Sequence, residues 1–123
     1  MAKGQELGSF SMQATSVTVS PGVAGSTLIR VNYEGTADGF GTIVGTGTFV
    51  GGPKGGALGW CGVAYSETGD QLTSNGSGAY ESVGVNRWGT SAVIHISDGS
   101  AVLSEGVIDL ASRSLTGKNY AWT

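Results

Sequence analysis

The chain has 123 residues and a mass of 12.3 kDa, a size that fits one domain with a single core and excludes a catalytic domain joined to a separate binding domain. Gly occupies 23 positions, charged residues make up only 12%, and the net charge is -3. This composition favours β-structure, and it argues against nucleic acid as a partner, because nucleic-acid binding requires a basic surface.

The counts of cysteine and histidine limit metal chemistry. One Cys and one His cannot form an internal disulfide or a structural zinc site, which uses four N or S ligands, so we expect no metal and no cofactor. The segment Met1–Glu6 lacks the apolar region of a secretory signal, and no run approaches the roughly 18 apolar residues of a membrane helix. We therefore expect a soluble cytoplasmic protein without a membrane partner, in which residues 1–8 form a flexible N-terminus.

Hydrophobic periodicity indicates strands throughout the chain. No long stretch has apolar residues at helical spacing, whereas many runs alternate or are rich in Val, Ile, Thr and aromatic residues. We predict eight strands, roughly at residues 9–19, 26–36, 41–50, 57–66, 71–82, 86–97, 101–110 and 112–122.

Short connections rich in Gly, Asp and Pro separate these strands, so they form an up-and-down meander that must bury one face of each strand. We predict that residues 1–123 form one all-β domain, an eight-stranded antiparallel up-and-down β-barrel. Glycines within the strands, such as Gly45 and Gly47, suit strongly coiled strands and open space in the lumen. The interior of an eight-stranded barrel is filled by side chains or holds one small ligand.

The pair Asp98-Gly99 predicts a two-residue type I′ turn, which fixes the register of its hairpin. In this register, the pairs that share the predicted lumen face are Ile94 with Leu103, Ala92 with Glu105, and Trp88 with Asp109. Carboxylates beside an indole in an apolar wall are either paired with a base or raised in pKa, so Glu105 and Asp109 are candidate acid-base residues. The competing interpretation is that both carboxylates lie at a rim or in a structural salt bridge.

The Asp38-Gly39 hairpin, treated in the same way, places Arg30 opposite glycine. If this face is inward, Arg30 could neutralise Glu105, and if it is outward, Arg30 is a solvated charge; the sequence leaves both open. Aromatic and aliphatic residues that could line a ligand pocket, although core packing also explains them, are Tyr33, Trp60, Tyr80, Trp88 and Leu103.

Two segments of the chain carry a family resemblance. Tyr33–Thr42, followed by the glycine-rich Gly45–Phe49, resembles the small allene-oxide-cyclase-like (calycin-like, lipocalin-like) barrels and their bacterial relatives of unknown function. The segments Glu105–Leu110 and Leu115–Tyr120 fit the last strands of such a barrel. The resemblance implies a mainly apolar lumen and a homodimer or homotrimer, and it implies no particular activity, because no active-site motif of the plant cyclases aligns with this chain.

Three functions are open at this point. The first is binding of one small, mostly apolar molecule in the lumen, oriented by Glu105, Asp109 and Arg30. The second is an isomerase or cyclase in which one of the lumen carboxylates transfers a proton. The third is a structural or interaction protein with a filled lumen, whose outer apolar face would comprise Val93, Val102, Ile108 and Leu110.

Overall fold

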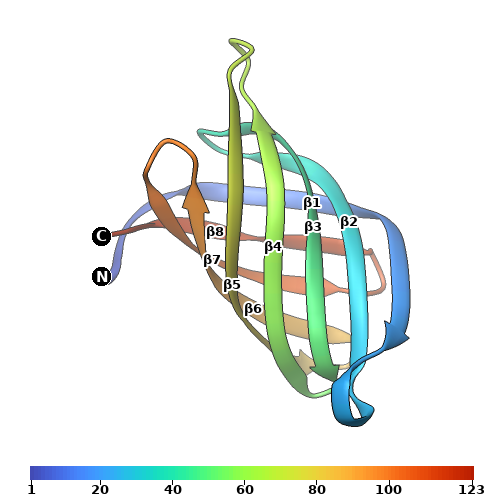
Figure 1. The fold of residues 1–123 in the computed structure, drawn as a ribbon. Coiled ribbons are helices and arrows are strands. Elements are labelled where there is room, and N and C mark those ends of the chain that lie inside the picture. The colour runs from blue at the N-terminus through green and yellow to red at the C-terminus, as the bar shows by residue number, and fades with distance from the viewer.

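The computed structural model describes residues 1–123, and its eight antiparallel strands close into a barrel in chain order (Figure 1). This confirms the predicted all-β barrel. The only other element is a short 3₁₀ turn, and no helix has the length and apolar character needed to cross a bilayer. The elements are β1 (Lys3–Pro21), η1 (Val23–Gly25), β2 (Thr27–Ala37), β3 (Gly41–Gly52), β4 (Gly55–Tyr65), β5 (Gln71–Gly84), β6 (Arg87–Ile96), β7 (Ala101–Asp109) and β8 (Ser114–Trp122).

Strand β1 closes the barrel, because it pairs with β2 along its C-terminal part and with β8 along its N-terminal part. It begins at Lys3, which lies opposite Trp122, so most of the segment predicted to be a flexible N-terminus is paired with β8. A register shift between Ala14 and Ser16 changes which side chains face inward. As a result Val17 and Val19, beyond the shift, face the lumen.

The hairpin between β6 and β7 has a different loop from the one predicted. The Gly99 N–H donates to the Ile96 carbonyl at 2.9 Å, the Ile96 N–H donates to the Ser100 carbonyl at 2.9 Å, and Gly99 has φ 92°. This is a three-residue loop in which glycine takes the left-handed position after the turn. The pairing therefore shifts by one residue, Ile94 lies opposite Val102, and the side chains of β7 before its last residue change face.

The same one-residue difference occurs in the Asp38-Gly39 hairpin, where Arg30 lies opposite Thr48 and Tyr33 lies opposite Gly45. The inward face of β2 is the one with Val31 and Tyr33, and Arg30 lies outside, which is the outward alternative that the sequence left open.

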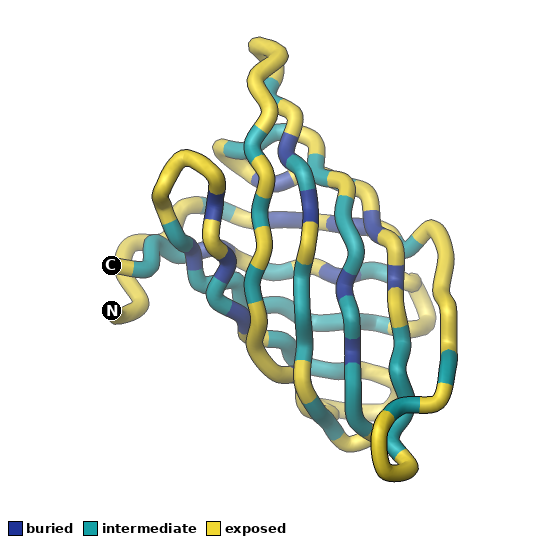
Figure 2. Tube along the Cα trace, in the orientation of Figure 1, coloured by how far each residue is buried: buried dark blue, intermediate teal, exposed yellow.

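The barrel is hollow over much of its length. Only 16 of 123 residues are buried, and no large side chain is completely shielded from solvent. Figure 2 shows these buried positions as short segments within the strands, with exposed loops at both ends. The main core cluster comprises Phe10, Met12, Val31, Tyr33, Ala37, Phe49, Tyr80 and Leu115.

Inward glycines of β3 and β4 accommodate aromatic rings. A Cβ on Gly45 would lie within 2.5 Å of two ring atoms of Trp60, and one on Gly62 would lie 2.7 Å from the same ring. The Trp60 indole can therefore lie flat against the backbone only because both positions lack a side chain. Part of the space that the strand glycines open is thus taken by aromatic rings.

Candidate functional site

The lumen contains a large apolar cavity of about 500 Å³ at one end of the barrel. We call this the mouth end; it carries η1 and the β3–β4, β5–β6 and β7–β8 loops and lies at the lower right in Figure 1. Loop residues such as Pro53 and Leu110 line the cavity together with strand residues, so it opens at this end. Its apolar walls include Ala14, Val17, Val19, Ile29, Val31, Phe49 and Ile108.

Two polar groups in these walls are already satisfied by the backbone. The Trp88 Nε1–H donates to the Pro53 carbonyl at 2.8 Å, and the Tyr80 hydroxyl donates to the Gly52 carbonyl at 3.2 Å. Both bonds hold the β3–β4 loop at the edge of the cavity. The Tyr80 ring also packs edge-on against Phe49, with ring centroids 5.5 Å apart. The aromatic side chains therefore present mainly their apolar surfaces to the cavity.

Charged side chains reach this cavity only at its mouth, where Asp109 and Arg113 line it. Asp109 Oδ1 accepts a hydrogen bond from the Ala111 N–H at 3.0 Å, which closes the β7–β8 turn. Arg113 has φ 53° in the same turn. Asp109, which the sequence predicted on the lumen face, thus lies at the rim, in agreement with the competing interpretation.

A second, smaller cavity of about 100 Å³ lies farther into the barrel, and Tyr33 and Phe49 line both cavities. Its walls are mostly apolar but include Ser74, Ser104 and Asn119. The Trp60 Nε1–H donates to Ser74 Oγ at 3.1 Å. Asn119 is only 8% exposed, and its amide makes no hydrogen bond within the chain. Every fully buried side-chain N or O atom of the protein has a hydrogen-bond partner. The unpaired amide of Asn119 is therefore not fully enclosed by protein atoms, and it faces the space of the small cavity.

Tyr33 lies where the two cavities meet and is 3% exposed. Burial raises the pKa of its hydroxyl to about 12, because the surrounding apolar side chains disfavour the phenolate. Burial also raises the pKa of Tyr80. Both hydroxyls therefore stay neutral near pH 7, where they can donate hydrogen bonds but are poor proton-transfer groups.

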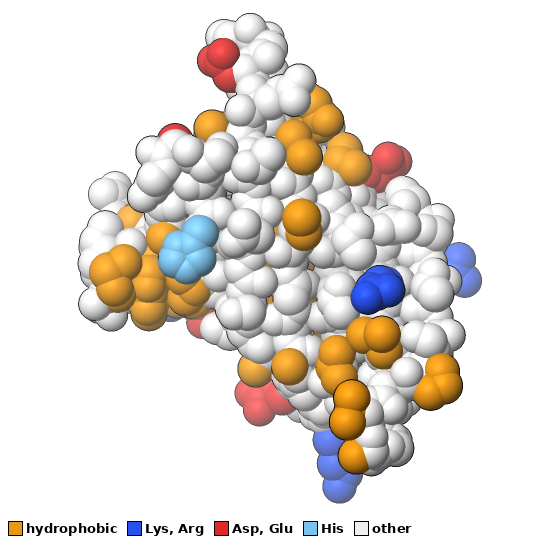
Figure 3. Space-filling view, in the orientation of Figure 1, with side chains coloured by type: hydrophobic (Ala, Val, Ile, Leu, Met, Phe, Trp, Pro, Cys, Tyr) orange, Lys and Arg blue, Asp and Glu red, His pale blue; other side chains and the backbone are white.

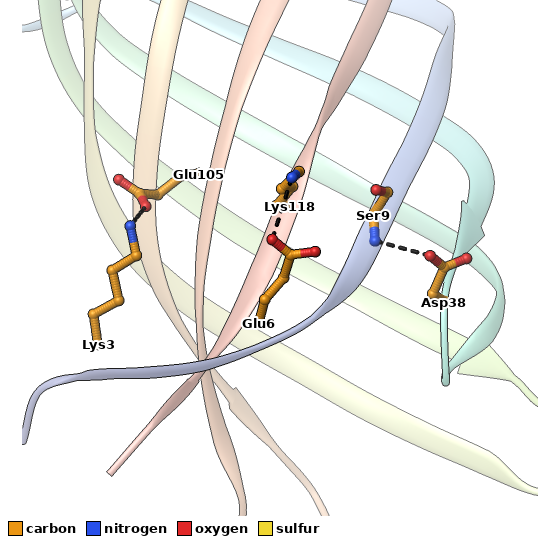
Figure 4. Close-up of polar contacts among 6 residues, drawn as sticks. All are labelled: Lys3, Glu6, Ser9, Asp38, Glu105 and Lys118. Carbon is orange, nitrogen blue, oxygen red and sulfur yellow. Dashed lines mark hydrogen bonds and ion pairs between the residues drawn. The ribbon is translucent and has the colours of Figure 1, made fainter.

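Glu105 does not lie in the lumen, which corrects the register-based prediction. It lies opposite Ser91 of β6 and Lys118 of β8 on the outer wall. Its Oε1 accepts a hydrogen bond from Lys3 Nζ at 2.8 Å in an ion pair with both side chains half-exposed (Figure 4). The hydrogen bond to Glu105 also raises the pKa of Lys3. The alternative interpretation of Glu105, a structural salt bridge, agrees with this geometry.

Two further candidate ligand-binding residues lie outside the barrel. Arg30 is exposed and projects from β2 between Thr18 and Thr48, so it cannot neutralise a lumen acid. Leu103 lies on the outer wall between Val93 and Tyr120. The outer position of Leu103 follows from the extra residue in the β6–β7 loop, and the outer position of Arg30 is the second of the two alternatives that the sequence left open.

The aromatic candidate residues, unlike Arg30 and Leu103, lie inside the barrel. Tyr33, Trp60, Tyr80 and Trp88 all line the lumen. The predicted outer apolar face is not formed, since Val102 is buried and Ile108 lines the large cavity.

Sequence reasoning missed the polar residues of the small cavity and the arginine at the mouth. Asn119 follows from strand alternation, because it lies four residues after the inward Leu115 on β8. Ser104 is predicted to face the lumen only when the observed register of β7 is used. No local pattern marks Arg113 as a residue of the mouth.

The chain matches no protein-family model, and comparisons with curated proteins and with solved structures found no similar protein.

Proposed function

We propose that this protein binds one small, predominantly apolar molecule in its lumen, with access from the mouth end. The observation that carries the proposal is the cavity of about 500 Å³ with apolar walls, a volume within the range of about 300–1,000 Å³ typical of small-molecule sites. A barrel whose role were only structural would have this space filled, because dispersion contacts and burial stabilise packed interiors.

The lining selects the chemistry of the ligand. The polar atoms of Trp88 and Tyr80 are hydrogen-bonded to backbone carbonyls, so the body of a ligand in the large cavity would contact mainly carbon atoms. A charged ligand atom deep in this cavity would be desolvated without a partner, at a cost of several kcal/mol. Asp109 and Arg113 could interact with a charged or polar end only if that end stays at the mouth.

Binding is better supported than isomerase or cyclase chemistry. The proton transfer in the cyclase hypothesis was assigned to lumen carboxylates, but Glu105 is ion-paired with Lys3 outside the barrel, and Asp109 is engaged in a turn. The neutral hydroxyl of Tyr33, with a pKa of about 12, is no substitute near neutral pH. The resemblance to allene-oxide-cyclase-like barrels is therefore retained for lumen binding and not for catalysis.

The proposal is tested with the neutral apolar fluorophore N-phenyl-1-naphthylamine, whose emission increases in an apolar environment. The test variant is Ile29→Trp, which adds a large ring to the wall of the large cavity. The matched control is Thr18→Trp, which adds the same ring on the exposed outer side of the adjacent strand. We expect the wild type and Thr18→Trp to bind the fluorophore alike, and Ile29→Trp to bind it at least tenfold more weakly.

Thermal denaturation of each variant establishes that it is folded. Equal affinity of the two folded tryptophan variants would mean that the probe binds elsewhere, which contradicts the proposal. If Ile29→Trp fails to fold, Ile108→Phe supplies a smaller increase in volume on the opposite wall with the same expected loss of affinity.

A further inference from the structure

The loops at the two ends of the barrel differ in chemistry. At the far end, opposite the mouth, the hairpin tips are polar or acidic: Asp38-Gly39, Glu67-Thr68-Gly69 and Ser97-Asp98-Gly99. At the mouth end, aliphatic residues occupy tip positions. Val85 is 90% exposed in the two-residue β5–β6 turn, and Val23 is 84% exposed in η1. Turn tips normally carry Gly, Asn, Asp or Pro, and a β-branched apolar side chain gains nothing there from the fold itself.

These two valines belong to a larger set at the mouth end of the barrel. Most of the exposed large hydrophobic residues of the protein lie here, and we call the following set the apolar rim: Val17, Val19, Val23, Val83, Val85 and Leu110. Three of its members also line the cavity. The rim and the cavity walls therefore form one continuous apolar surface that extends to solvent.

Basic and acidic residues are also distributed unequally between the two ends of the barrel. Lys3 and Lys118 are in ion pairs with Glu105 and Glu6. The remaining basic residues all lie on the mouth half: Arg30, Lys54, Arg87 and Arg113. Only Glu81 and Asp109 oppose them there, whereas the far-end loops carry Asp38, Glu67, Asp70 and Asp98 and no basic residue. In Figure 3, basic side chains lie beside hydrophobic ones toward the lower right, and acidic side chains cap the uppermost hairpin.

We propose that the mouth end docks on an anionic lipid bilayer, with the apolar rim inserted into the interface and the basic residues next to the headgroups. Aliphatic side chains surrounded by Lys and Arg are the combination that binds such surfaces, through apolar burial and attraction to anionic lipids. The acidic far end would then face away from the negative surface. An apolar ligand could pass between the bilayer and the lumen without crossing water.

A bilayer fits this surface better than a second copy of the chain. Val23, Val85 and Leu110 lie in three separate connections at the mouth end, so a deformable surface can contact all three at once. Two mouths placed face to face would bring the basic residues of both copies together, which is unfavourable. The proposal also replaces the sequence-based expectation of no membrane partner, which rested on the absence of a long apolar segment and not on surface chemistry.

The test is flotation of the full-length protein with vesicles of phosphatidylcholine alone and of phosphatidylcholine with phosphatidylglycerol, without added ligand. We expect binding to the anionic vesicles that weakens as salt is raised. Val85→Glu, at an exposed tip that packs against nothing, should reduce this binding at least tenfold. Val44→Glu is the matched control; it introduces the same charge at a half-exposed position on the outer wall of β3 and should bind nearly as the wild type does.

A second pair of variants tests the electrostatic part. Lys54→Gln at the mouth should weaken binding to anionic vesicles roughly fivefold, the effect of losing one basic contact near the surface. Lys118→Gln changes the net charge equally on the outer wall and should have a clearly smaller effect. Equal effects of the two variants would mean that only net charge matters, which contradicts docking through the mouth.

Two further results would overturn the proposal. One is a lack of binding to either vesicle. The other is a concentration-dependent dimer in light scattering that Val85→Glu dissociates, since the rim would then be covered by a second copy. Binding of N-phenyl-1-naphthylamine in vesicle-free solution is measured separately, so failure of docking with intact lumen binding would leave the proposed function standing.

Discussion

Replacing Gly45 by alanine tests how closely the Trp60 ring is packed against the strand backbone. The new Cβ would lie 2.4 Å from Cζ2 and 2.5 Å from Cη2 of Trp60, and 2.8 Å from the Cys61 carbonyl oxygen. Real carbon contacts need about 3.5 Å or more, so the ring must move toward the small cavity. That movement also strains the hydrogen bond of 3.1 Å from Trp60 Nε1 to Ser74 Oγ.

The expected cost follows from these contacts. Overpacking of this kind costs about 1–3 kcal/mol, and loss of a neutral hydrogen bond costs about 0.5–1.5 kcal/mol. The lower conformational entropy of alanine in the unfolded chain offsets about 0.4–1 kcal/mol. We therefore expect Gly45→Ala to lower the free energy of unfolding by about 2 kcal/mol, within a range of about 0.5–4 kcal/mol, measured by urea denaturation with tryptophan fluorescence as the signal.

Gly59→Ala is the control for this substitution. Gly59 lies on the outer side of β4, where a Cβ would meet only Thr48 Cβ at 3.9 Å. Its free energy of unfolding should equal that of the wild type or exceed it slightly. The reasoning about Trp60 is refuted if Gly45→Ala is as stable as Gly59→Ala.

Three further predictions concern polar groups. With a pKa of about 12 in the folded state and about 10 when unfolded, Tyr33 should make the free energy of unfolding fall by about 3 kcal/mol as the pH rises from 10 to 12; Tyr33→Phe should flatten this decline in urea titrations. Asn119→Leu, which removes an unpartnered amide from the small cavity, should raise the free energy of unfolding by about 1 kcal/mol, and a loss of stability would show that the amide has a partner such as bound water. Hydrogen bonds from the Ser100 hydroxyl and N–H lower the pKa of Asp98, so Ser100→Ala should raise this pKa in an NMR titration, and no change would contradict the assignment.

The strands and the barrel could be predicted from the sequence because Gly- and Asp-containing turns separate short segments of high β-propensity. The hairpin register could not, since Asp98-Gly99 fits a two-residue turn as well as the last two positions of a three-residue loop. The alternation of apolar and polar residues along β7 did not decide between the two registers, because Val102 and Leu103 are both apolar. One signal did favour the observed register: the predicted one placed Glu105 in an apolar lumen at a cost of several kcal/mol.

The candidate site was predictable to the extent that large side chains mark the lumen. Aromatic residues such as Tyr33 and Trp60 were predicted in the pocket because of their size, since the barrel has little other bulk to place there, although strand alternation left their face undecided. The charged residues were not predictable in this way, since their position depends on a one-residue choice at each loop. The large cavity also depends on tertiary structure, because the register shift within β1 turns Val17 toward the lumen.

The most direct test of lumen binding is an NMR titration of the methyl groups with N-phenyl-1-naphthylamine. We expect saturable shifts concentrated on Ile29, Val31 and Ile108, which line the large cavity, and little change at Leu103 on the outer wall. Shifts centred on Leu103 and its outer-wall neighbours, or no shifts at a probe concentration that saturates fluorescence, would contradict binding in the lumen.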